Sequence, residues 1–149
     1  MNSIVFRTVP AEKRPRLVFG FVKDDGGRES TAFSEYRDCT VHALVHVSGV
    51  PYPQVHKLCA DWGRKPRKGF INFQLAAPRM AADLGIELTT VEAPGTLGKL
   101  IAKHPTETLL VRVSGHAFAV KASIVRDLWP QSALRRVKNA WIVSSKSAA

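Results

Sequence analysis

The sequence contains only two cysteines, Cys39 and Cys59, among its 149 residues. A disulfide between them is possible in principle, but a cytosolic chain of this size needs no covalent staple. A free cysteine in such a chain is more often a buried apolar residue than a nucleophile, so neither thiol can be assigned chemistry without local evidence.

Long apolar runs are also absent. No stretch approaches the roughly 20 apolar residues that cross a bilayer. Residues 1–17 lack the apolar core and the small-residue cleavage site of a secretory signal. We therefore expect a soluble, cytoplasmic protein that makes no membrane contact.

What the chain does contain fits a folded domain. Apolar residues make up 45% of the sequence and the aromatic residues are spread along it, which argues against intrinsic disorder. The length suits one domain over residues 1–149 with its own hydrophobic core. Residues 1–16 are polar and contain proline, and we expect them to form an extended N-terminal arm.

Acidic residues are scarce relative to basic ones: 12 Asp and Glu stand against 22 Lys and Arg, a net charge of +10. Such a surface attracts polyanions, so an acidic protein or a nucleic acid is one interpretation of the charge. The other is a solvated basic face that binds nothing. The basic clusters lack the interleaved aromatics of a single-strand binder. The candidate binding patch is the cluster Arg64, Lys65, Arg67 and Lys68.

Apolar spacing predicts helices in the first half of the chain and strands in the second. A helix should begin after Asp38 as its N-cap and end at Gly49. We expect two more helices, from about Pro53 to Trp62 and over Pro78–Leu84. Strands are expected at Ile4–Arg7, Arg16–Lys23, Ile86–Glu92, Thr108–Val113, His116–Lys121, Ile124–Trp129 and Ala140–Val143, with a short helix at Thr96–Lys103. This order predicts an α+β fold whose N-terminal helices pack on a C-terminal antiparallel sheet.

Three sequence features together indicate acyl-transfer chemistry. Cys39 stands at the start of the first helix, where unpaired N–H groups and the helix dipole favour a thiolate. His116 begins a strand directly after the Ser114–Gly115 turn, and Asp127 ends the next strand. If these strands form a hairpin, Asp127 lies near His116 and fixes its tautomer. A nucleophile, its base and an orienting acid are the parts that such a reaction requires.

The same features resemble the papain-like cysteine hydrolases. The helix-opening Cys39, the strand-borne Gly115-His116 and the triplet Asp127-Leu128-Trp129, which is similar to the superfamily's Asn-Ser-Trp element, carry the resemblance over roughly residues 35–130. The run from Asp38 to Gly69 also resembles short phage and bacterial proteins. The resemblance implies a papain-like fold, a protein or peptide substrate, no cofactor and an amide cleaved through an acyl-enzyme at Cys39.

One departure concerns the oxyanion. Papain-like peptidases place a Gln several residues before the Cys, whereas residues 33–38 contain none. The backbone N–H of Cys39, the hydroxyl of Ser34 or that of Tyr36 could donate instead. Asp38 and Trp129 complete the candidate pocket residues.

Other interpretations of the same residues stay open. Cys39, His42 and His46 share one helical face, and His56 and Cys59 repeat a three-residue spacing, which could make a zinc site. This spacing is not that of the common zinc fingers. The alternative, which we favour, has no metal: His42 and His46 are partly exposed and Cys59 lies in the core.

Three functions follow from these interpretations. The first, which we favour, is a cysteine hydrolase of peptidase or amidase type. The second is a catalytically inactive papain-like protein, phage-encoded and acting in the host cytoplasm, that binds and modulates a host protein or nucleic acid. The third is a basic nucleic-acid-binding module in which the Cys and His residues are structural.

Overall fold

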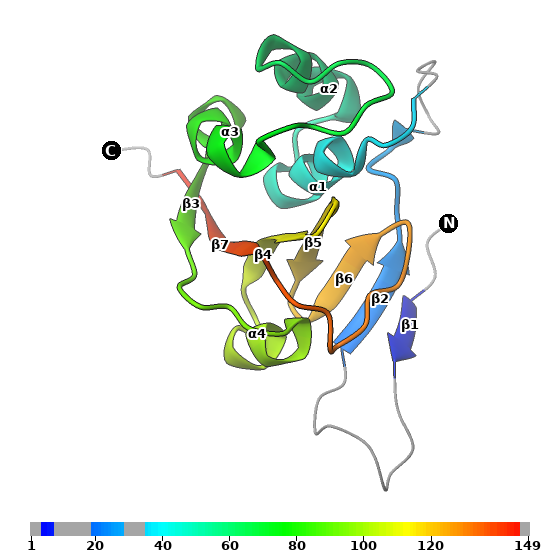
Figure 1. Cartoon of the computed structure of the whole chain (residues 1–149), viewed down its shortest axis with the longest axis vertical. Helices are drawn as coiled ribbons and strands as arrows, with labels where there is room; N and C mark the ends of the chain where they lie inside the picture. The colour runs from blue at the N-terminus through cyan, green and yellow to red at the C-terminus, as the bar shows by residue number, and fades with distance from the viewer. Residues whose placement is uncertain (1–3, 8–18, 29–34, 147–149) are drawn as a thin grey trace, which may run out of the picture.

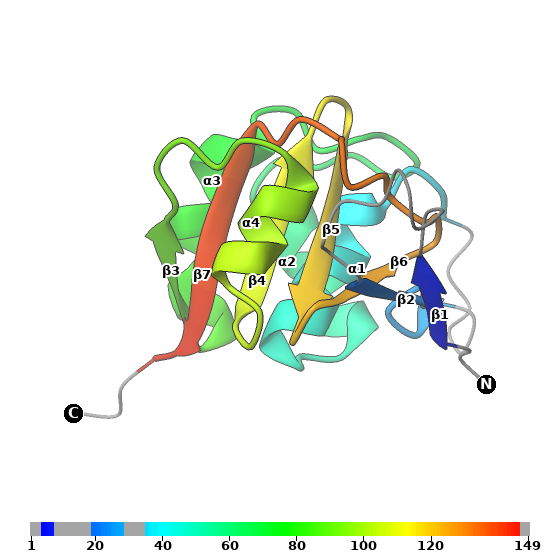
Figure 2. The ribbon, with the colours of Figure 1, turned by 90° about the horizontal axis from the view of Figure 1, so that it is seen from below.

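The computed structural model describes residues 4–7, 19–28 and 35–146 of the chain. They form one mixed sheet of seven strands in the order β1-β2-β6-β5-β4-β7-β3. Helices α1, α2 and α3 cover one face of this sheet and α4 covers the other (Figures 1 and 2). The strands are β1 (Ile4–Arg7), β2 (Phe19–Lys23), β3 (Ile86–Thr90), β4 (Thr108–Val113), β5 (His116–Lys121), β6 (Ile124–Asp127) and β7 (Asn139–Ser145). The helices are α1 (Cys39–Ser48), α2 (Tyr52–Asp61), α3 (Phe73–Met80) and α4 (Leu97–Lys103).

The α+β class is confirmed, and strands β3 to β7 pair antiparallel as predicted, but two N-terminal strands join them and make the whole sheet mixed. Strand β2 pairs in parallel with β6, and β1 extends the sheet beyond β2. A parallel pair needs a long crossover, which here contains α1 to α4 and β3 to β5. Strand periodicity shows that a segment is extended but not which partner it has, so the sequence left this pairing open. The rest of the predicted arm, residues 1–3 and 8–16, lies outside the described residues.

The third helix begins earlier than predicted. Its expected range was Pro78–Leu84, but α3 runs over Phe73–Met80 with Pro78 inside it, and Ala81–Leu84 forms a 3-10 turn. Phe73, Ala77 and Met80 are buried at helical spacing, and the burial of this stripe outweighs the hydrogen bond that Pro78 cannot donate.

Strand β6 is shorter than the predicted Ile124–Trp129, because it ends at Asp127. The Asp127 carboxylate accepts a hydrogen bond from the backbone N–H of Leu128 at 2.7 Å. A local bond of this kind removes a donor from the ladder and turns the chain.

Alternation along β4 and β5 divides the core into two layers. Leu110, Ala117 and Ala119 pack with the α1 to α3 side, whereas Val111 and Phe118 pack with the α4 side. The two alanines are small, so α1 can lie close to β5. This contact keeps the first residues of α1 close to the first residues of β5.

None of the helices among the described residues has the length and apolar character that crossing a membrane requires.

The turn after β2 rests directly on α1. Asp24 accepts the N–H of Gly26 at 2.9 Å, and Gly26 has a φ of 71°. A Cβ placed on Gly26 would lie 2.7 Å from the Cβ of His42 and 3.0 Å from its Cα. Only glycine therefore permits this approach of the turn to the helix.

Replacing Gly26 by alanine should destabilise the fold by about 3 kcal/mol, since a left-handed alanine and a steric overlap add together. The matched control is Gly49→Ala, which has a φ of 75° and no atom within 4 Å of the added Cβ. It should cost only about 1 kcal/mol. Urea unfolding of both variants measures the difference, and equal costs would show that the turn does not press on α1.

Candidate active site

Cys39 is the first residue of α1 and is partly exposed. Asp38 stands at the N-cap position, as predicted, but its side chain makes no capping hydrogen bond. The first backbone bonds of the helix run from Val41 and His42 to the Asp38 carbonyl. In the part of the chain that the structure describes, the N–H groups of Cys39 and Thr40 therefore stay unpaired and available to a ligand at the sulfur.

His116 and Asp127 lie on adjacent antiparallel strands. The register pairs Ala119 with Arg126, and one further step places Asp127 opposite Phe118, diagonal to His116. The Nε2 atom of His116 lies 2.6 Å from the Oδ2 atom of Asp127. The thiol of Cys39 lies beside the His116 ring, and the two residues line the same hollow. Because Nε2 is used by Asp127, the Nδ1 atom is the one left for the sulfur.

The Asp127 carboxylate is fully buried and held by three donors. Its Oδ2 atom accepts Nε2 of Gln131 at 2.9 Å in addition to His116, and Oδ1 accepts the backbone N–H of Leu128. A buried carboxylate needs such partners. These three hydrogen bonds hold the carboxylate in one orientation, in which Oδ2 faces the imidazole.

These contacts set the charge of His116. Burial of the ring disfavours its charged form, but the hydrogen bond to Asp127, the adjacent Cys39 and the charge of Asp127 outweigh burial and raise the pKa of His116 from 6.5 to about 10. The ring is then an imidazolium near neutral pH. A cation beside a thiol favours the thiolate.

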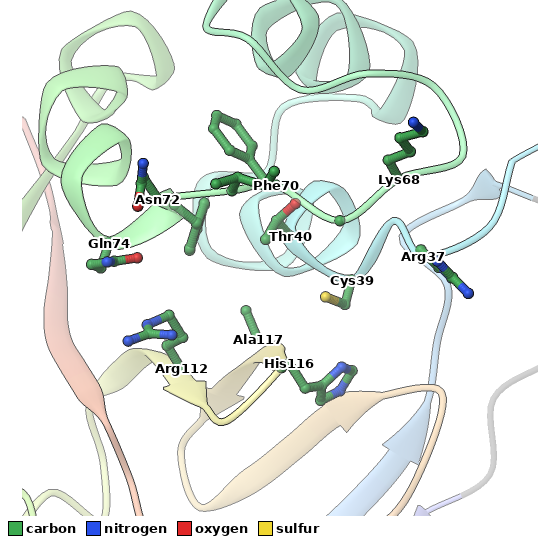
Figure 3. Close-up of a pocket in the computed structure, with 14 residues that line it drawn as sticks. Arg37, Cys39, Thr40, Lys68, Phe70, Asn72, Gln74, Arg112, His116 and Ala117 are labelled. Carbon is green, nitrogen blue, oxygen red and sulfur yellow. The ribbon is translucent and has the colours of Figure 1, made fainter.

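Cys39 and His116 line two hollows at once, and Figure 3 shows the first of them. The first hollow, of about 550 Å³, extends toward β4 and the start of α3. The second, of about 590 Å³, extends toward Tyr36 and Trp129. Both hollows are open to solvent, so a substrate can reach the sulfur from either side.

Of the four predicted pocket residues, Tyr36, Trp129 and Asp38 line the second hollow. Tyr36 and Trp129 are 55% and 65% exposed and line the second hollow. Ser34 lies outside the described residues. Asp38 borders the second hollow but cannot donate to an oxyanion, because its carboxylate accepts the Tyr52 hydroxyl at 2.6 Å and Arg28 at 2.8 Å.

Sequence reasoning missed these partners of Asp38, and it missed Gln131. Arg28 and Tyr52 anchor Asp38 and with it the residue that precedes the nucleophile. Gln131 follows Pro130 in an irregular segment, where no periodicity marks a buried side chain. Its only sequence signal is a polar residue four positions after the candidate acid.

The predicted basic patch needs correction at Arg64. This side chain is buried, not exposed, and its Nη1 atom lies 3.0 Å from the Oε2 atom of Glu35. Glu35 also binds His56 and the backbone N–H of Arg67. Burial opposes the charge of Glu35, yet these donors lower its pKa from 4.5 to about 2. Arg64 thus ties the segment before Cys39 to the loop after α2, and only Lys65, Arg67 and Lys68 are exposed.

The exposure expected for two histidines is also wrong. His42 and His46 are buried, and burial lowers the pKa of His42 from 6.5 to about 4 despite the nearby charge of Asp38. Nowhere in residues 4–7, 19–28 and 35–146 do three His, Cys, Asp or Glu side chains gather as a metal site requires. Cys59 is buried in the core, as expected, and burial raises its pKa from 9.0 to about 12.

Comparison with known protein families, with curated proteins and with solved structures gave no match to this chain. The function is therefore inferred from the geometry of the site.

The titration of His116 should show the effect of its two partners. We expect its ring protons to titrate near pH 10 by NMR, and the pKa to fall in Asp127→Asn because the carboxylate charge is lost. The raised pKa also stabilises the fold: this contribution is complete below pH 6.5 and is lost as the pH rises through 10. A wild-type ring that titrates near 6.5 would contradict the hydrogen-bonded pair.

Removing the Gln131 donor should destabilise the protein, because the Asp127 charge would stay buried with one partner fewer. Gln131→Leu should cost about 2 kcal/mol in urea unfolding. Gln54→Leu, at an exposed position of α2, is the control and should cost less than about 0.5 kcal/mol. Equal costs would show that Gln131 contributes nothing through Asp127.

Proposed function

We propose that the chain is a papain-like cysteine hydrolase of peptidase or amidase type, with Cys39 as nucleophile, His116 as general base and acid, and Asp127 as the residue that orients the imidazole. One observation carries the proposal: a single imidazole hydrogen-bonds to a buried carboxylate on one side and lies beside a helix-opening thiol on the other, in an open cleft. The order helix-borne Cys, strand-borne His and acid on the adjacent strand supports the papain-like assignment.

The reaction begins with attack of the Cys39 thiolate on the carbonyl carbon of an amide. A C–S bond forms and the carbonyl oxygen becomes an oxyanion, which accepts a hydrogen bond from the N–H of Cys39 in place of the missing Gln. His116 gives its Nδ1 proton to the amide nitrogen as the C–N bond breaks. The amine leaves and a thioester remains on Cys39.

Hydrolysis completes the cycle. Water enters where the amine was, and neutral His116 takes one of its protons as the oxygen attacks the thioester carbon. The C–S bond then breaks, which releases a carboxylic acid and restores the thiolate and the imidazolium. Asp127 keeps its negative charge throughout, because its task is to hold the ring and stabilise its cation.

Thiol labelling tests this proposal without knowledge of the substrate. Iodoacetamide at pH 7 should alkylate Cys39 at least about tenfold faster than Cys59, which is buried with a pKa of about 12. His116→Ala should slow the labelling of Cys39 by about tenfold or more. Asp127→Asn should slow it less, since an amide can still orient the imidazole. Peptide mass mapping assigns each label.

The control is His104→Ala, which removes a histidine outside the cleft that contacts Glu107. It should leave the rate at Cys39 unchanged. Slow labelling of Cys39 that is indifferent to His116 would refute a hydrolase and favour the non-catalytic protein that binds a host partner.

A further inference from the structure

The first hollow is cationic. Arg37, Lys68 and Arg112 line it together with Cys39 and His116, and none of its lining residues is Asp or Glu. Within the part of the chain that the structure describes, none of these three basic side chains forms an ion pair. Uncompensated positive charge thus gathers beside the thiol, where an anionic group of a ligand would be stabilised.

Arg112 is the best-placed of the three. It projects from β4, and its Nε atom donates to Oδ1 of Asn139 at 2.7 Å. This bond orients the guanidinium and leaves its two terminal nitrogens for a ligand. A guanidinium held in this way matches the two oxygens of a carboxylate. In Figure 3 it lies on the sheet side of the hollow, whereas Lys68 lies on the opposite, loop side.

The same hollow also has an apolar wall. Phe70, Ile71 and Phe73 line it, and Ile71 is 84% exposed. An exposed isoleucine beside a cleft contributes nothing to the core and is suited to a ligand that covers it. The walls therefore match a ligand with both an anionic group and an apolar part.

The second hollow has a different character. Its acidic residue, Asp38, is paired with Arg28 at 2.8 Å, and it shares Arg37 with the first hollow. Trp129 and Tyr36 provide exposed aromatic surface. Because the two hollows share Cys39 and His116, a chain that lies through both would place its backbone over the sulfur.

From these features we infer that the substrate is an extended peptide with an acidic side chain beside the cleaved amide, seated in the hollow of Arg112, Lys68 and Arg37. The residues on the other side of that amide lie against Trp129 and Tyr36. This inference rests on the proposed function for the location of the cleaved bond. It adds the substrate class and the residues that select it.

Binding to the full chain with Cys39→Ala tests the inference without turnover. The probes are rhodamine-labelled octapeptides of Ala and Leu in which one Glu occupies each position in turn, each paired with a Gln peptide. In fluorescence anisotropy we expect at least one Glu peptide to bind about tenfold more tightly than its Gln partner, the effect of one charged hydrogen bond. The preference should shrink as salt is added.

The selecting residues are tested in the same Cys39→Ala background. Arg112→Gln and Lys68→Gln should each reduce the Glu preference to about threefold or less. Arg79→Gln is the matched control, since it removes the same charge from an exposed position on α3 outside the hollow, and it should keep the preference. Lys68 lies in an exposed loop, so its variant remains informative even if Arg112→Gln unfolds.

Equal binding of Glu and Gln peptides, or a preference that Lys68→Gln leaves intact, would overturn the inference. So would a single-stranded oligonucleotide that binds more tightly than every Glu peptide and loses affinity in the same variants, since the hollow would then select a nucleic acid. These outcomes are independent of thiol labelling. A peptide preference with an inert Cys39 refutes only the hydrolase, and a reactive Cys39 without the preference refutes only the substrate class.

Discussion

The hydrogen bond between His116 and the buried carboxylate of Asp127 is the interaction on which the site depends. A carboxylate without exposure is costly to ionise unless donors surround it, and here His116, Gln131 and Leu128 do so. In return, the anion keeps the imidazole charged although burial of the ring opposes that charge. Without Asp127, the histidine beside Cys39 would be an ordinary neutral imidazole and the thiol would lose its cation.

The position of Cys39, the proposed nucleophile, depends on several contacts that α1 makes. Ala117 and Ala119 let the helix lie close to the sheet, and Gly26 lets the turn after β2 reach it. Asp38, bound by Tyr52 and Arg28, fixes the chain one residue before Cys39. The position of the Cys39 sulfur is therefore determined by the packing of α1 and by the polar network around Asp38, and not by the helix alone.

Local patterns were sufficient for the parts of the protein that local forces determine. The bounds of α1, the cap of α4 at Thr96 and the β5–β6 hairpin all follow from nearby residues. The meeting of Cys39, His116 and Asp127 was deduced from the same signals with the help of a resemblance. Apart from the start of α3 and the end of β6, what the sequence did not predict was non-local: the parallel pairing of β2, the burial of Arg64 by Glu35, and the role of Gln131. Each depends on which distant segment lies nearby, and neither periodicity nor charge clustering encodes that.

The parallel pairing of β2 with β6 has a consequence for biosynthesis. The backbone N–H of Asp24 bonds to the carbonyl of Asp127, so the first described segments hold the strand that carries the acid. These two strands are roughly 100 residues apart, and contacts of such separation form late and slowly. On the ribosome, Cys39 emerges long before His116 and Asp127, its proposed activating partners. In a nascent or prematurely terminated chain Cys39 would consequently lack both partners, and the proposed site would form only after strands β5 and β6 had been synthesised and docked.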